Sequence, residues 1–302
     1  MVEFFAEEPL AQARTFTRSY GGDVLNALVV AARLGSPTGF ITRVGNDPFG
    51  SGLLAAWQAE GIDTRMAPLV EGENGVYFIS LLPDGEREFT YRRRGSAASQ
   101  ITPEDLEPTY LAQARILLLS GITQAISPSA QATALAAARI VHSAGGLVAF
   151  DPNYRSRLWA ERGGLEAAQA ALAELTPYIN LLLPSFPADL PVLGVEASSP
   201  SQALASLVPR FPMLALKAGA AGAWLAFQGQ LRHQPPFPPT ALRDSTGAGD
   251  AWNGTFLHFW LKGTDPFEAG QVANRVAAAK LAYRGAIPPQ PWPWIEEESR
   301  CS

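Results

Sequence analysis

The residues from Asp244 to Asp250 have the types and spacing best suited to chemistry. Two glycines flank an alanine, an aspartate follows, and an apolar helix is expected to run on to Lys262. Small residues let the backbone turn sharply and present unpaired N–H groups at a helix start, where the helix dipole favours an anion. The Asp250 carboxylate would repel a resident phosphate. The pattern therefore suits a phosphoryl group in transfer, with Asp250 taking a proton from an attacking hydroxyl.

The same short pattern also fits an ordinary glycine-rich turn with an aspartate helix cap. The surrounding elements favour the chemical interpretation, because strand-like and helical segments alternate along the chain. Strands are expected at 39–44, 116–119, 147–150, 179–183 and 213–217, and helices at 24–34, 49–60, 128–144, 165–175, 202–207 and 266–283. This order predicts an α/β fold with a mostly parallel sheet, helices on both faces, and ligands at the carboxyl ends of the strands.

One region breaks this alternation. The runs 76–82 and 86–92 are strand-like and surround Pro83-Asp84-Gly85, which is a hairpin signal. Residues 14–20 are also strand-like. We expect a small sheet that covers a site, with strands from about 2–20 and 75–93, inside a single domain of residues 1–302. A second hairpin is expected at 223–227 and 231–234.

The composition excludes several classes of protein. Of the 302 residues, 47% are hydrophobic and 17% charged, which suits a large core and excludes global disorder. The net charge of −5 argues against a nucleic-acid partner. Cys301 alone makes neither an internal disulfide nor a zinc cluster. No apolar run reaches the length of a membrane span, and the acidic start lacks a signal-peptide pattern, so we expect a cytoplasmic protein without a membrane partner.

Two segments resemble the signatures of the ribokinase (PfkB) family of sugar kinases. Residues 244–254 resemble the second signature, and residues 21–50, beginning Gly21-Gly22-Asp23, resemble the first. The resemblance covers about Arg14 to Pro288 and implies a ribokinase-like three-layer α/β/α core with a small β-sheet lid. It also implies ATP as phosphoryl donor and a divalent cation, usually Mg²⁺. The matching residues imply that Asp250 is the catalytic base and that the amides of Gly247, Ala248 and Gly249 form the anion hole.

Within the family, the segments 91–97, 119–123 and 151–159 resemble 2-keto-3-deoxygluconate kinases. That substrate is a keto acid, so its site must neutralise a carboxylate, and a planar arginine fork suits this task. Tyr91 and Arg93 lie two apart on a strand and should share a face, whereas Arg92 should point away. A solvated edge strand remains an alternative for this arginine run.

The resemblance also implies roles for further residues. Substrate contacts are implied for Gly22, Asn26, Tyr77, Tyr91, Arg93, Arg155 and Asp250. ATP contacts are implied for Asn153, Arg155, Lys217, Gly219, Gly222, Thr246, Gly247, Gly249 and Asn274. Plainer interpretations stay open: Asn26 as a helix cap, Arg155 and Lys217 as surface side chains, and Asn274 as a solvated helix residue.

The sequence departs from the family pattern at three places. Relatives begin with a hydrophobic strand before the segment that corresponds to Val2–Phe5. We expect either that the start was assigned too far downstream or that the protein tolerates the gap by oligomerising, with another segment or partner covering the sheet there. The family's Asn-x-x-Glu motif should follow Leu183, but the sequence reads Pro184 to Asp189 and leaves Asp189 as the nearest acid. The metal ligands are therefore not assigned. Ala286 stands where the keto-acid kinases often have an acidic residue.

The sequence as a whole predicts ATP-dependent phosphorylation of the terminal hydroxyl of a sugar acid, with 2-keto-3-deoxygluconate converted to its 6-phosphate. A neutral-sugar kinase such as a fructokinase is one alternative, and a non-catalytic sugar- or nucleotide-binding relative is another. We expect a homo-oligomer, a dimer or higher, that forms through the β lid.

Overall fold

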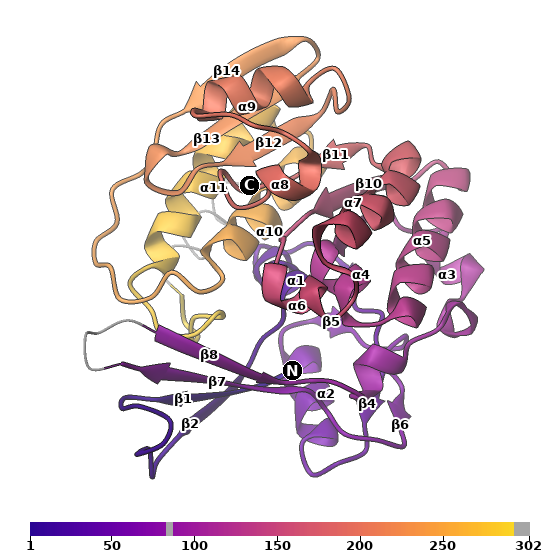
Figure 1. The fold of residues 1–302 in the computed structure, drawn as a ribbon, viewed down its shortest axis with the longest axis vertical. Helices are drawn as coiled ribbons and strands as arrows, with labels where there is room; N and C mark the ends of the chain where they lie inside the picture. The colour runs from indigo at the N-terminus through magenta and orange to yellow at the C-terminus, as the bar shows by residue number, and fades with distance from the viewer. Residues whose placement is uncertain (83–86, 293–302) are drawn as a thin grey trace.

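A computed structural model describes residues 1–82 and 87–292 (Figure 1). Its main sheet has six strands in the order β14-β13-β12-β11-β10-β9. The bounds are β9 (Ile116–Ser120), β10 (Leu147–Asp151), β11 (Leu181–Leu182), β12 (Leu214–Lys217), β13 (Ala223–Phe227) and β14 (Gln230–Gln234). The four strands β9 to β12 run parallel, and the last two pair antiparallel. The predicted mostly parallel sheet is confirmed.

Alternate residues of the sheet belong to two different cores. In β10, Val148 and Phe150 pack with the helices on one face, while Ala149 packs with those on the other. Leu182 in β11 lies in the first core and Leu181 in the second. Because successive side chains of a strand point to opposite faces, this division confirms a three-layer α/β/α core.

Helices cover both faces of the sheet (Figure 1). One face carries α5 (Pro128–Ser143), α7 (Gly164–Leu175) and α9 (Pro200–Leu207), and the other carries α1 (Asp23–Arg33), α10 (Ala248–Leu261) and α11 (Pro266–Lys280). The remaining helices are α2 (Gly50–Ala59), α3 (Pro108–Leu111), α4 (Gly121–Ile126), α6 (Ser156–Ala160) and α8 (Leu190–Leu193). Short 3₁₀ turns occupy Ala97–Gln100, Pro103–Asp105, Thr176–Tyr178 and Gly219–Ala221.

A second, four-stranded sheet lies apart from the main one, at the bottom of Figure 1. Its order is β2-β1-β7-β8, with β1 (Val2–Ala6), β2 (Thr17–Tyr20), β7 (Val76–Leu81) and β8 (Arg87–Arg92). Strands β7 and β8 are antiparallel, and Tyr77 stands directly opposite Tyr91. The predicted small sheet is therefore present. The expected turn at residues 83–85 lies outside the described residues, as does Cys301.

The strand predicted over residues 39–44 is wrong as one element. The structure has two short strands instead, β3 (Thr38–Gly39) paired with β5 (Ile62–Asp63), and β4 (Val44–Gly45) paired with β6 (Leu69–Val70). The facing segment turns between the two pairs, where the N–H of Ala67 donates to the carbonyl of Thr64. Because residues 64–67 form a turn, the strand pairing is interrupted between the two pairs. A hydrogen bond remains there, from the N–H of Thr42 to the carbonyl of Met66.

Candidate active site

A large cavity of about 1490 Å³ lies where the carboxyl ends of the parallel strands face the small sheet. It is lined by residues of α1, β7 and β8, by the loop after β10, and by the start of α10. Pockets for a single drug-sized ligand measure about 300–1,000 Å³. This cavity therefore has room for two ligands side by side, such as a nucleotide and a sugar.

The start of α10 forms one end of the cavity. Gly247 precedes the helix with φ 75°, a left-handed conformation that glycine adopts without steric cost. In the part of the chain that the structure describes, the N–H groups of Gly247 and Gly249 make no backbone hydrogen bond, and both residues line the cavity. Thr246 lines it as well, whereas Ala248, which begins the helix, does not, and its N–H donates to the carbonyl of Ser245 at 3.2 Å. Of the three amides predicted for the anion hole, those of Gly247 and Gly249 are therefore available to an anion, and that of Ala248 is not.

Asp250 lies in the first turn of α10 and is held by Asn26 of α1. The Asn26 side-chain N–H donates to Asp250 Oδ2 at 2.7 Å, while Asn26 Oδ1 accepts the N–H of Gly22 at 3.1 Å. Asn26 is therefore both a helix-start residue and the orienting partner of the carboxylate. Burial, together with the charges of Asp23 and Asp151, raises the pKa of Asp250 to about 7, although the Asn26 hydrogen bond and the Lys217 charge lower it. A carboxylate with this pKa is suited to accept a proton near neutral pH. We call Asn26, Gly247, Gly249 and Asp250 the transfer end.

The small sheet supplies aromatic and basic side chains on the opposite side. The rings of Tyr77 and Tyr91 stack at 5.7 Å, and the Arg93 guanidinium lies 4.7 Å from the centre of the Tyr91 ring. Tyr77 is 4% exposed and its hydroxyl donates to Glu3, whereas Tyr91 is 44% exposed. Among the described residues, Arg93 has no ion pair, and burial lowers its pKa. Its positive charge thus forms no ion pair in residues 1–82 and 87–292, although the Asp23 carboxylate lies close enough to raise the pKa of Arg93.

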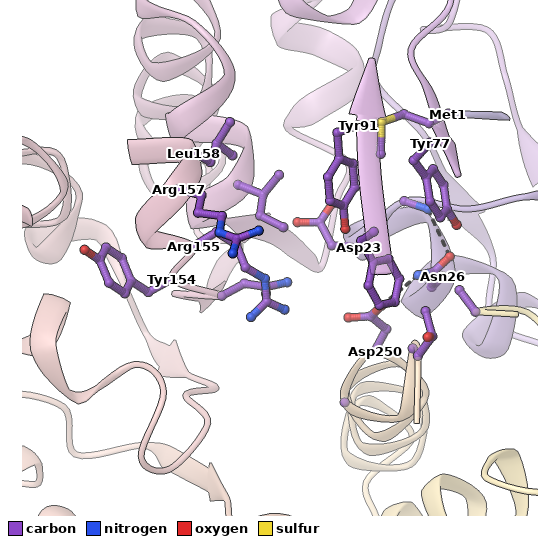
Figure 2. Close-up of a pocket in the computed structure, with 18 of the residues that line it drawn as sticks. Met1, Asp23, Asn26, Tyr77, Tyr91, Tyr154, Arg155, Arg157, Leu158 and Asp250 are labelled. Carbon is purple, nitrogen blue, oxygen red and sulfur yellow. Dashed lines mark hydrogen bonds between the residues drawn. The ribbon is translucent and has the colours of Figure 1, made fainter. Parts of the chain in front are cut away.

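Arg155 and Arg157 extend into the cavity from the far side (Figure 2). They flank the start of α6 and face the side that carries Tyr91, Asp23 and Asp250. Arg155 was predicted at this site, but Arg157 was not. We call Asp23, Tyr91, Arg93 and Arg155 the sugar end. The expectation that Arg92 points away from the site is wrong in part, because this exposed residue also borders the cavity.

Asp23 is a site residue that sequence reasoning missed. It begins α1 and borders the cavity, and its Oδ2 is buried without a hydrogen-bond partner in the structure. Burial raises its pKa, while the Ser120 hydroxyl and the Arg93 charge lower it. An unsatisfied buried oxygen costs free energy, so this atom is suited to a ligand hydroxyl. The signal in the sequence was its place directly after Gly22, where it can also be read as a helix-start acid.

Lys217 lines the cavity at the end of β12, where a buried polar cluster holds its side chain. Its ammonium donates to Asp151 Oδ2 and to Asn253 Oδ1, both at 2.8 Å, and Asn253 donates to Asp151 at 2.6 Å. Lys217 is 8% exposed and lines the cavity, so it is not the surface lysine that the plainer interpretation describes. Asn153 also lines the cavity, and its N–H donates to Asp151 Oδ1.

Three residues predicted to contact ATP do not line the cavity. Asn274 is buried between α11 and β14, where it accepts from the Trp252 indole and donates to the carbonyls of Gln234 and Pro235. Because its amide is hydrogen-bonded inside the protein, the interpretation as a solvated helix residue is wrong, and the contact with ATP stays a prediction. Gly219 and Gly222 lie in the turn between β12 and β13, and a Cβ on Gly222 would stand 2.2 Å from the Gln234 carbonyl.

Asp189 and Asp151 are the acids that fit a divalent cation at this cavity. Asp189 is buried and accepts the N–H groups of Tyr154 and Ser185, each at 2.7 Å. Burial and the charge of Asp151 raise the pKa of Asp189 to about 6. No group of three metal-binding side chains occurs in residues 1–82 and 87–292. A cation that keeps several waters and binds phosphate oxygens suits this donor set.

No helix in the described part of the chain is both long and apolar enough to span a membrane.

Comparison with known proteins identifies the family. The model of the pfkB family of carbohydrate kinases matches residues 1–293. A 2-dehydro-3-deoxygluconokinase of Dickeya dadantii is 31% identical over 287 residues, which cover 90% of each chain. A fructokinase of Klebsiella pneumoniae is 35% identical over 236 residues, 77% of this chain and 74% of its own. A crystal structure of a putative ribokinase II from E. coli, in complex with ATP and Mg²⁺, superposes with a TM-score of 0.86 at 24% identity over 100% of this chain and 96% of its own, which confirms the ribokinase-like fold. The chain belongs to the pfkB family of carbohydrate kinases.

Proposed function

We propose that this kinase transfers the γ-phosphoryl group of ATP to the terminal hydroxyl of 2-keto-3-deoxygluconate. The observation that carries the substrate is the sugar end of the cavity. There Arg155 lies across the cavity from Tyr91 (Figure 2), whose ring the Arg93 guanidinium contacts, and neither arginine forms an ion pair with a described residue. A substrate carboxylate supplies the missing negative charge and accepts their N–H groups. The similarity to 2-dehydro-3-deoxygluconokinases supports the same substrate.

The transfer end performs the chemistry. The substrate hydroxyl loses its proton to Asp250, whose carboxylate the Asn26 amide holds in place. The hydroxyl oxygen forms a bond to the γ-phosphorus as the bond from that phosphorus to the bridging oxygen breaks, and ADP leaves. The N–H groups of Gly247 and Gly249 stabilise the charge on the γ-phosphoryl oxygens during transfer. The alternative of a non-catalytic binding protein does not explain why Asp250 is oriented in this way.

Mg²⁺ accompanies ATP in this proposal, and Asp151 and Asp189 are the residues that would hold it. When bound, it neutralises phosphate charge. Lys217 pairs with Asp151 beside this position and contributes a further positive charge toward the nucleotide. Asn153, Arg155 and Thr246 complete the proposed nucleotide contacts.

A fructokinase activity is the second candidate, favoured by the 35% identity to the Klebsiella enzyme. The two candidates differ at the sugar end, because fructose carries no carboxylate. An ADP-release assay with 2-keto-3-deoxygluconate, fructose and ribose separates them directly. Our proposal requires the highest kcat/KM for the keto acid. A higher value for fructose would replace it with the second candidate, and release of ADP with none of the sugars would refute both.

The proposal extends to assembly and location. We propose that the small sheet acts as a lid over the sugar and also joins copies of the chain into a homo-oligomer. In support, its outer strands β2 and β8 each have an unpaired edge in the described sheet, and Phe16 and Phe89 beside them are exposed. Light scattering coupled to size-exclusion chromatography measures the oligomer. We place the reaction in the cytoplasm, where ATP is available.

A further inference from the structure

Lys280 is a fully buried charge that the proposed mechanism does not use. It lies in the last turn of α11 and its side chain is 0% exposed. Its ammonium donates to the carbonyl of Asp244 at 2.8 Å and to that of Tyr283 at 3.3 Å, and it lies 4.0 Å from Asp244 Oδ1. Burying an ammonium costs free energy that only hydrogen bonds and opposite charge repay. Such a residue therefore needs an explanation.

The carbonyls that Lys280 contacts belong to two loops that meet at the anion hole. Asp244 begins the loop that ends at Gly247, and its carboxylate accepts the N–H groups of Thr246 and Gly285, each at 2.8 Å. The two loops also approach each other closely at Gly247, where an added Cβ would stand 2.6 Å from the Ala286 carbonyl oxygen. The conformation of Gly247 therefore depends on how closely the two loops approach each other.

Buried acidic side chains near Lys280 also favour a positive charge at this place. Glu3 of β1 is 2% exposed, and its pKa is raised by burial and by the charge of Asp244, while Lys280 lowers it. The ammonium thus contacts two backbone carbonyls, lies near the Asp244 carboxylate, and also affects a second buried acid, Glu3. Carbonyl and carboxylate oxygens arranged around a positive charge are the ligands that a hard monovalent cation takes from a protein.

We propose that Lys280 is a positioning residue for phosphoryl transfer: its ammonium is a built-in monovalent cation that holds the 244–247 and 283–286 loops together and so fixes the anion hole. The inference rests on the proposed kinase reaction but not on the identity of the sugar. Because the cation is covalently attached, wild-type turnover should not depend on which monovalent cation the buffer contains.

The first test replaces the ammonium with an apolar chain of similar length, Lys280→Met. We expect kcat to fall by roughly 10- to 100-fold, the usual effect of a small displacement of catalytic groups, while KM for the sugar changes by less than about twofold. Val276→Ala is the matched control, because Val276 is a buried core residue of the same helix. It should lower Tm and leave kcat unchanged. Wild-type kcat in folded Lys280→Met would overturn the proposal.

The second test supplies the charge from solution. Lys280→Ala leaves a space beside the same carbonyls. Ammonium chloride or potassium chloride should raise the kcat of this variant several-fold, whereas choline chloride at equal ionic strength should not. Equal recovery in choline would show a general salt effect and refute the positioning role. Activation of the wild type by potassium over choline would show that a separate ion does this work. If Lys280→Met does not fold, Lys280→Gln takes its place in the first test.

A third readout separates this inference from the proposed substrate. ADP, Mg²⁺ and aluminium fluoride together mimic the phosphoryl group in transfer, and this mixture should raise Tm of the wild type more than that of Lys280→Met. The measurement needs no sugar. A wild type that ignores 2-keto-3-deoxygluconate would refute the substrate assignment alone. An equal rise in Tm for both proteins would refute the role of Lys280.

Discussion

The two ends of the cavity are built in different ways. At the transfer end, protein groups orient the base, because Asn26 holds Asp250, and the backbone N–H groups of Gly247 and Gly249 are left for the phosphoryl group. At the sugar end, Arg93 and Arg155 have no described ion pair, and Asp23 Oδ2 has no partner. The first end holds its catalytic carboxylate in place before any ligand binds, whereas the charged side chains of the second gain their partners only when a ligand binds. We infer that the transfer end sets the rate and that the sugar end selects the substrate.

The largest expected effect is at the transfer end. Asp250→Asn keeps the shape of the side chain and removes the base, so kcat should fall by roughly 10² to 10⁴, the usual contribution of a general base. The affinity for sugar and ATP should change little, since the lost interaction acts mostly in the transition state. Steady-state kinetics and calorimetric binding measure the two effects. Glu268→Gln, an exposed carboxylate on α11, is the control. Wild-type turnover of Asp250→Asn would remove Asp250 from the mechanism.

At the sugar end the expected effect is selective. A charge-assisted hydrogen bond contributes about 1.5–3 kcal/mol, so Arg93→Ala should lower kcat/KM for the keto acid by roughly 10- to 100-fold. Activity on any neutral sugar that the enzyme accepts should change far less. Arg155→Ala should raise KM for both the sugar and ATP.

The control for Arg93 is Arg18→Ala, because Arg18 lies on the small sheet but does not line the cavity. Arg92 is unsuitable for this purpose, since it borders the cavity. If Arg93→Ala weakens fructose and the keto acid equally, the arginine does not bind a carboxylate and the contrast between the two ends fails.

The pH profile tests the transfer end without a mutation. The pKa of Asp250 is raised to about 7, and the base works only when it is ionised. The kcat/KM of the free enzyme should therefore rise with pH and level off above pH 7. One unit below the pKa, about a tenth of the enzyme is ionised, so the rate at pH 6 should be about tenfold below the plateau. A profile that is flat from pH 5 to 8 would contradict a base with this pKa.

The smallest expected effect is that of Tyr91→Phe. The ring remains and keeps its stacking on Tyr77, but the hydroxyl, which is expected to contact the substrate, is lost. A neutral hydrogen bond contributes about 0.5–1.5 kcal/mol, so KM for the keto acid should rise by roughly two- to tenfold with little change in kcat. Tyr110→Phe, whose hydroxyl bonds Asp63 outside the cavity, is the matched control. A larger effect on kcat than on KM would place Tyr91 at the transfer end instead.

The features that could be predicted are those that depend on residues close to one another in the sequence. The glycine turn before Asp250 is a continuous segment, and the sheet follows from the alternation of helices and strands, so both could be predicted. Asn274 could not be placed, because its partners Gln234 and Pro235 lie about forty residues away. Asp23 was missed for a related reason. Its Oδ2 is buried without a hydrogen-bond partner in the structure, and the sequence does not show this.

The bond between Asn26 and Asp250 joins residues 224 positions apart. The helices that carry them pack so closely that a Cβ on Gly254 would stand 2.3 Å from the Ala27 carbonyl oxygen. Closing so long a stretch of chain is among the slow events of folding, because its entropy is lost before the contact forms. During refolding, enzymatic activity should therefore return no earlier than the slowest spectroscopic signal. A chain cut before α10 should keep no turnover, even where its remaining helices persist.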